Sequence, residues 1–123
     1  AVDAKGDVFF TDLRAGKIYR IEHATGKVAV WKEDSGGANG LMFGPDGRLY
    51  ACQYGRKRIV AYAPDGTETV LAEGVGSNDL VVNAKAEVWF SLRASQPSIQ
   101  SVTAATRKAV VAMKFCSARV SGR

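Results

Sequence analysis

Two asparagines occupy matching positions in the sequence and carry side chains that can bind a cation. Asn39 and Asn78 are 39 residues apart, and each opens a short apolar stretch, Asn39-Gly40-Leu41 and Asn78-Asp79-Leu80. Amide oxygens are ligands for hard cations such as Ca²⁺, and a neutral amide limits the negative charge of a site. Asparagine also tolerates the left-handed conformation and caps turns with its side chain, so a structural turn role is the alternative.

A repeat of about 40 residues sets the positions of these asparagines. Residues 2–31, 43–71 and 82–111 superpose, so that Val8, Leu49 and Val88 coincide, as do Ile18, Ile59 and Ile99. Period-two alternation with β-branched and aromatic residues predicts strands in every unit. The expected strands are 8–12, 17–21 and 27–31, then 49–53, 58–62 and 67–71, then 88–92, 98–102 and 108–111. Glycines at 6, 26, 47 and 66 lie where tight hairpins need a positive φ.

Four short antiparallel strands in about 40 residues are typical of a β-propeller blade. We therefore predict an all-β fold of about three four-stranded blades, near 1–38, 39–77 and 78–113, with an irregular basic tail over 114–123. A β-sandwich is the alternative, which the regular repetition disfavours. A closed propeller has about four to eight blades, so the chain is expected to be part of a larger ring. Innermost strands begin at the channel mouth, so Asn39 and Asn78 should point to a common centre.

The third unit departs from the pattern of the other two. Ala86 replaces the turn glycine, and after Glu87 the chain has six Lys or Arg residues and no acid. Divergence of an edge blade and a shifted reading frame both account for this change. The net charge is +5, but the basic residues are scattered, so nucleic-acid binding is not expected. No run approaches the roughly 18 apolar residues of a membrane helix, and the cellular compartment stays open.

The segments SGGANGLMFGPDGRLYACQYGRKRIVAYAPDGTETVLAEG (35–74) and SNDLVV (77–82) carry a family resemblance. They closely resemble the senescence marker protein / gluconolactonase / luciferin-regenerating enzyme family. The resemblance implies a six-bladed propeller that hydrolyses sugar lactones with one divalent cation, most often calcium. It also implies a metal set of one Glu, two Asn and one Asp, of which only the first Asn has a counterpart here, Asn78. The Glu would precede residue 1, and the second Asn and the Asp, which usually serves as the base, would follow residue 123.

The remaining candidate residues surround this position. Asp79 should point away from the channel and support Asn78, because successive strand residues face opposite sides. Gln53 and Tyr54 stand where some relatives carry Glu-His, and this replacement weakens a polar contact with the channel. The residues assigned to the substrate channel are Asn39, Asp79, Gln53 and Tyr54. Cys52 is expected to be a buried thiol. Solvated turn or loop positions are expected for His23 and for Arg56, Lys57 and Arg58.

The favoured interpretation is a fragment of a metal-dependent sugar-lactone hydrolase that is inactive alone and takes a sugar lactone only as part of a complete ring. No catalytic residue can be assigned within the chain. The alternative is a non-catalytic binding propeller of the NHL type, which shares the repeat pattern and holds no metal. Uncovered sheet faces at both ends of a three-blade unit also predict self-association.

Overall fold

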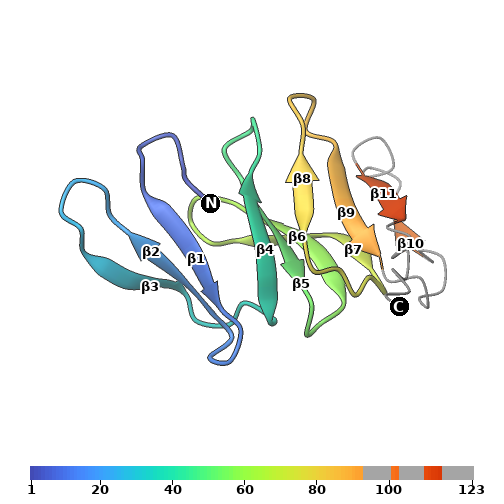
Figure 1. The fold of residues 1–123 in the computed structure, drawn as a ribbon, viewed down its shortest axis with the longest axis horizontal. Helices are drawn as coiled ribbons and strands as arrows, with labels where there is room; N and C mark the ends of the chain where they lie inside the picture. Colours follow the sequence, from blue (N-terminus) through green and yellow to red (C-terminus); the bar gives the residue numbers. More distant parts are fainter. Residues whose placement is uncertain (93–100, 103–109, 115–123) are drawn as a thin grey trace, which may run out of the picture.

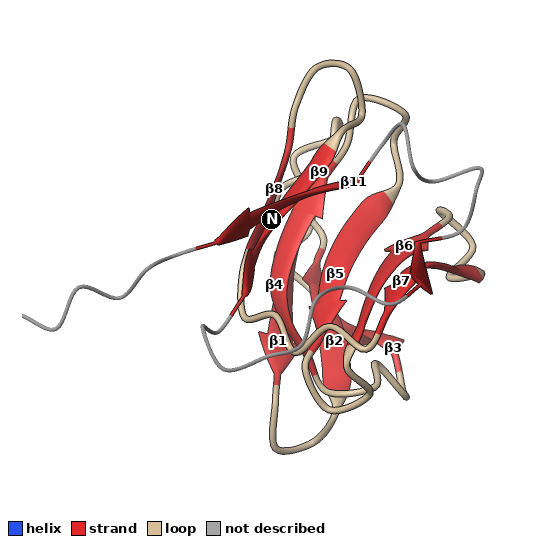
Figure 2. Ribbon diagram, turned by 90° about the vertical axis from the view of Figure 1, so that its right-hand side faces the viewer, coloured by secondary structure: helices blue, strands red, loops and turns tan. Residues whose placement is uncertain are grey.

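The computed structural model describes residues 1–92, 101–102 and 110–114, and these residues form three small sheets (Figure 1). The first sheet has the order β1-β2-β3, the second β10-β7-β6-β5-β4 and the third β11-β9-β8. The strands are β1 (Val8–Asp12), β2 (Lys17–Ile21), β3 (Val28–Lys32), β4 (Ala38–Phe43), β5 (Leu49–Gln53), β6 (Arg58–Tyr62), β7 (Glu68–Glu73), β8 (Leu80–Val82), β9 (Val88–Leu92), β10 (Ser101–Val102) and β11 (Val110–Lys114). Every labelled element is a strand (Figure 2), which confirms the all-β prediction.

The strands of the first two units lie close to where the repeat predicts them. Strands β1, β2, β5, β6 and β9 have the expected bounds, and β3 and β7 are shifted by one or two residues. The antiparallel pairs β1–β2, β2–β3, β4–β5, β5–β6 and β6–β7 form the expected meanders. Val2 adds an isolated antiparallel bridge to Val8, at the position that corresponds to an innermost strand.

The turns before β1, β5 and β9 share one geometry although their sequences differ. Gly6 and Gly47 have φ values of 87° and 77°, and Ala86 takes the same left-handed region with a φ of 60°. This conformation is sterically unfavourable for an L-residue with a side chain, because its Cβ approaches the neighbouring carbonyl oxygen. The third unit therefore keeps the backbone of the turn after losing the residue that suits it.

Two apolar clusters fill the spaces between the sheets. One lies between the first and second sheets and contains Phe9, Ile18, Ala38, Leu49, Ala51, Val60 and Tyr62. The other joins the second and third sheets and contains Tyr50, Cys52, Ile59, Ala61, Leu71, Ala72, Val75, Leu80, Val82, Val88 and Phe90. Strand β5 contributes alternate residues to the two clusters and is buried along its whole length. Sheet-on-sheet packing through alternating side chains is the contact expected between blades.

The third unit does not repeat the meander of the first two. Strand β11 lies beside β9 and runs parallel to it, whereas β10 pairs antiparallel with the outer strand β7. The loops that bring β2 and β6 back contain Gly16 and Gly55, but the corresponding segment 93–98 has no glycine and contains Pro97. A tight return beside β9 is therefore disfavoured. Lys114 ends β11, and the rest of the predicted tail, 115–123, lies outside the described residues.

Candidate functional site

The two in-phase asparagines meet at the beginnings of neighbouring strands. Asn39 lies in β4 and Asn78 lies two residues before β8, and the Nδ2 group of Asn39 donates a hydrogen bond to Oδ1 of Asn78. The backbones are joined as well, because the Gly40 N–H donates to the Asn78 carbonyl over 3.0 Å. Both side chains are solvent-accessible at this end of the sheets. The structure thus brings together the two amides that the repeat predicts to converge.

Gly40 allows the two strands to approach at this point. A Cβ on Gly40 would lie 2.8 Å from the Asp79 Cα atom and 2.9 Å from the Asn78 carbonyl oxygen. These distances are shorter than van der Waals contact, so any larger residue would push β4 away from the segment before β8. The Asn-Gly pair at 39–40 therefore supplies both an amide and the close approach that positions it.

Asp79 supports the backbone rather than joining the amide pair. Its Oδ1 atom accepts the N–H of Leu80 over 2.9 Å, and its carbonyl accepts the N–H of Ser91 over 3.0 Å and the hydroxyl of Ser77 over 3.1 Å. Both the supporting role of Asp79 and its assignment to the substrate channel stay predictions.

Two serines that the motif analysis did not select hold the segment around Asn78. The Ser91 hydroxyl accepts the N–H groups of Asn78 over 3.4 Å and Asp79 over 3.3 Å. Buried Ser77 accepts the Cys52 thiol over 3.3 Å and lies 3.4 Å from the Ser91 hydroxyl. Ser91 corresponds in the repeat to Thr11, whose hydroxyl donates to the Asn39 carbonyl over 3.2 Å. Comparing polar residues at equivalent repeat positions would have identified this support.

The structure places the Gln53 side chain inside the second sheet and not with the asparagines. Gln53 is fully buried, and its Nε2 group donates to the Tyr62 hydroxyl over 2.9 Å and to Glu68 over 2.6 Å. Arg58 donates to Gln53 Oε1 over 3.1 Å and to Glu68 over 3.0 Å, so Arg58 lies in a partly buried network and not in a solvated loop. Gln53 can reach no channel ligand without breaking this network.

Tyr54 lies at the same end of the sheet as the asparagine pair. It is 43% exposed, and its N–H donates to the Gly37 carbonyl over 3.0 Å, immediately before β4. Its ring is accessible at this end of the sheets.

Two other reactive groups are unsuited to catalysis at this end. Burial raises the pKa of the Cys52 thiol to about 12, so this cysteine stays protonated and is the buried thiol that the sequence predicts. His23 packs beside Gly6 in the turn region at the other end of the first sheet, and its N–H donates to Asp7 over 2.8 Å.

The described residues do not bring together the His, Cys, Asp or Glu side chains of a complete metal centre. Among the residues that the structure describes, no group of three or more His, Cys, Asp or Glu side chains could hold a metal ion. The amide pair offers neutral oxygens, whereas calcium takes about six to eight oxygen ligands and favours carboxylates among them. The described residues therefore do not by themselves fit a calcium ion.

In the part of the chain that the structure describes, no helix is long and apolar enough to cross a bilayer.

Comparison with protein families decides how this arrangement is classified. The model of the SMP-30/gluconolactonase/LRE-like region matches residues 1–113, which is most of the chain. The chain belongs to this family. A comparison with curated proteins gives no match.

Solved structures of this fold are similar over a limited length. A gluconolactonase from Xanthomonas campestris is 26% identical with a TM-score of 0.63, and the match covers 71% of this chain and 31% of that one. A virginiamycin B lyase from Staphylococcus aureus is 24% identical with a TM-score of 0.61, covering 73% of this chain and 32% of the lyase. A putative gluconolactonase is also 24% identical, with a TM-score of 0.60, covering 71% and 32% of the two chains. The chain therefore spans about a third of each relative and forms part of a propeller fold.

Proposed function

We propose that residues 1–113 form the part of a sugar-lactone hydrolase that contributes Asn78 to its central channel. The observation that supports this assignment is the hydrogen bond between the side chains of Asn39 and Asn78. Both side chains are solvent-accessible and lie at the starts of two neighbouring strands. Family membership adds support, since the family description includes gluconolactonases. The substrate class is a sugar lactone, and calcium is the expected cation of a complete ring.

The roles within the proposed site follow from the chemistry of the side chains. A bound divalent cation supplies Lewis-acid polarisation of the lactone carbonyl when the ligand set is complete. Asn78 would offer its amide oxygen to that centre, while Asn39 holds the amide in place. Ser91 and Asp79 fix the backbone on which Asn78 stands. The hydrolysis also needs a general base to activate water, and we assign that base to no residue of this chain.

Calcium titration of the 123-residue chain tests the incompleteness of the ligand set. Two neutral amides give little advantage over water as ligands, so we expect calcium binding no tighter than about 1 mM. Hydrolysis of gluconolactone should then proceed no faster than in buffer. Micromolar calcium binding that Asn78→Ala abolishes would show that this chain holds a working site by itself.

A chimaera tests the proposed role of Asn78 directly. Residues 1–92 would replace the matching part of the X. campestris gluconolactonase, which supplies the remainder of the ring. We expect the chimaera to bind calcium and hydrolyse gluconolactone, and Asn78→Ala to abolish both. Lys85→Ala serves as the control, because Lys85 is exposed in the turn before β9, away from the amide pair, and only its backbone N–H is bonded, to Asn83 Oδ1. Full activity in the Asn78→Ala chimaera would contradict the assignment.

A non-catalytic binding propeller is the competing function, and the same chimaera separates the two. A binding propeller of the NHL type would yield a folded chimaera with neither calcium binding nor hydrolysis. Circular dichroism and a cooperative thermal transition would establish that this chimaera is folded. In that case the amide pair would be a structural contact between blades.

A further inference from the structure

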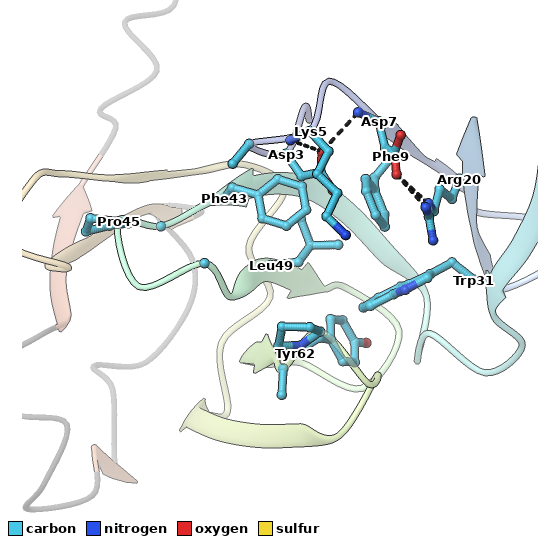
Figure 3. Close-up of a pocket in the computed structure, with 15 residues that line it drawn as sticks. Asp3, Lys5, Asp7, Phe9, Arg20, Trp31, Phe43, Pro45, Leu49 and Tyr62 are labelled. Carbon is cyan, nitrogen blue, oxygen red and sulfur yellow. Dashed lines mark hydrogen bonds and ion pairs between the residues drawn. The ribbon is translucent and has the colours of Figure 1, made fainter. Parts of the chain in front are cut away.

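A cavity of about 460 Å³ lies between the first and second sheets, away from the asparagine pair (Figure 3). Phe43, at the end of β4, lines it, whereas Asn39 lies near the beginning of the same strand. The rest of the lining comes from the turns before β1 and β5, from strands β1, β2, β3, β5 and β6, and from the two residues after β6. Its volume lies within the range of about 300–1,000 Å³ that is usual for small-molecule sites.

Aromatic rings form one continuous wall of this cavity. Phe9 makes edge-to-face contacts with Trp31 and Phe43, at ring-centre distances of 5.3 and 5.1 Å, and Trp31 makes a third with Tyr62 at 5.7 Å. Phe9 and Tyr62 are buried, whereas Trp31 and Phe43 are only partly buried. The wall therefore offers two accessible rings to a flat apolar ligand, held in place by two rings behind them.

The carboxylates beside the cavity are already bound by other groups. Asp3 Oδ1 accepts the N–H groups of Lys5 and Asp7, each over 2.9 Å. Asp7 accepts the backbone N–H of His23 over 2.8 Å and the Arg20 Nε group over 2.7 Å. These donors, led by the backbone hydrogen bond, and the positive charges of Arg20 and Lys5 hold the pKa of Asp7 below its usual value. Asp3 therefore fixes the turn over residues 3–7, and Asp7 ties this turn to Arg20 and His23.

Lys5 acts on Asp7 through its charge without pairing with it, and its ammonium can still meet a ligand. Within the ranges that the structure describes, no hydrogen bond or ion pair involves its Nζ group. Figure 3 shows the Lys5 side chain extending into the cavity between Phe9 and Phe43. A ligand with one anionic group would meet this ammonium beside the aromatic wall.

The third unit contains the same turn, and its residues do not line this cavity. Asn83 Oδ1 accepts the N–H groups of Lys85 over 2.9 Å and Glu87 over 3.0 Å, as Asp3 does for Lys5 and Asp7. Lys85 therefore occupies the position of Lys5 in the third unit but does not line the cavity. Lys85 provides a control lysine in a matching turn.

We propose that this cavity binds a small planar aromatic carboxylate. The ring lies against Trp31 and Phe43, and the carboxylate pairs with the Lys5 ammonium. The proposal is independent of the lactonase assignment, because the cavity is built from the first two sheets and contains neither Asn39 nor Asn78.

Binding of 1-naphthoate to the full chain tests the proposal, with 1-naphthalenemethanol as the uncharged probe of similar shape. Calorimetry should give a dissociation constant for naphthoate below about 1 mM, as expected for a ligand of its size. The indole N–H signal of Trp31 should shift on binding. The alcohol should bind about fivefold more weakly, which is the upper range for a partly exposed ion pair.

Matched lysine variants separate the cavity from general charge attraction. Lys5→Met keeps most of the apolar stem and should weaken naphthoate about fivefold without changing the affinity for the alcohol. Lys85→Met should change neither affinity. Trp31→Phe, which keeps an aromatic ring in the wall, should weaken both probes. The proposal is overturned if naphthoate does not saturate below about 1 mM, if Lys5→Met binds like the wild type, or if Lys85→Met has the same effect as Lys5→Met.

Discussion

Asn39 and Asn78 are 39 residues apart in the sequence, yet the side chain of one donates directly to the side chain of the other. Asn39 lies in β4 of the second sheet and Asn78 in the segment that leads into β8 of the third, so the hydrogen bond links two neighbouring sheets. The amide of Asn78 is thereby held in one orientation before any ligand arrives. Such pre-organisation lowers the cost of binding in a functional channel.

Gly40→Ala should separate these two blades. The added Cβ would lie within 3 Å of backbone atoms of Asn78 and Asp79, which cannot move aside as a flexible side chain would. We expect a loss of about 2 kcal/mol in the free energy of unfolding, measured by urea denaturation. Asn39→Ala, which removes only the exposed amide contact, should cost less than about 1 kcal/mol. Equal stability of Gly40→Ala and the wild type would show that the strands approach less closely.

Ala86→Gly should stabilise the chain. Ala86 has a φ of 60°, in the region where glycine avoids the steric cost that a side chain incurs. Relief of that cost should outweigh the added flexibility of the unfolded chain and raise the free energy of unfolding by about 0.5–1 kcal/mol. Ala84→Gly in the same turn is the control and should be neutral or destabilising, because Ala84 is not among the positive-φ residues. The reverse order of the two variants would contradict the strain argument.

Alkaline pH should destabilise the protein through Cys52. Burial raises the pKa of this thiol from 9.0 to about 12. Between these values the unfolded chain has released a proton that the folded chain retains, so the free energy of unfolding falls as the pH rises. In a Cys116→Ser background, Cys52→Ala should reduce this slope by up to about 1.4 kcal/mol per pH unit. Tyr62, whose pKa burial also raises to about 12, should keep a residual slope in that variant. An unchanged slope would show that the thiol is accessible to water.

Self-association should depend on the outer face of the first sheet. Phe10 and Val30 are 41% and 38% exposed there, next to Val8 and Val28, and Phe10 stacks on Tyr19. Exposed apolar faces of this kind promote association. Phe10→Lys combined with Val30→Lys should shift sedimentation toward the monomer. Leu13→Lys is the control, since Leu13 is 51% exposed in the turn after β1 and not on this face. A wild-type chain that sediments as a compact monomer would contradict the prediction.

The repeat predicted those features that recur with its period. Strand bounds in the first two units and the meeting of Asn39 with Asn78 both follow from counting residues, because equivalent positions occupy equivalent places in successive blades. The burial of Gln53 did not follow, since β5 is covered on both faces and alternation cannot say which side faces a channel. The pairing of β11 with β9 also escaped prediction; segment 93–98 lacks a glycine equivalent to Gly16 and Gly55, which favours the return of the chain beside the preceding strand.

The cavity beside Lys5 could not be predicted for a different reason. The cavity depends on the distance between the ends of the first and second sheets, and no single segment of the sequence determines that distance. The sequence shows the Asp-Ala-Lys-Gly-Asp turn but not which side chains of β2, β3 and β6 stand opposite it. The supporting roles of Ser77 and Ser91 were accessible in principle, because Ser91 recurs in phase with Thr11.

The position of strand β5 between the two apolar clusters also affects how the protein unfolds locally. Leu49 and Ala51 belong to one apolar cluster and Tyr50 and Cys52 to the other, so opening one cluster leaves the other face of this strand covered. Its amide protons should be replaced by deuterium only when both clusters open together, whereas those of β3, at the outer edge of the first sheet, should exchange through local fraying. Strand β5 is therefore expected to be the last strand to lose protection against exchange.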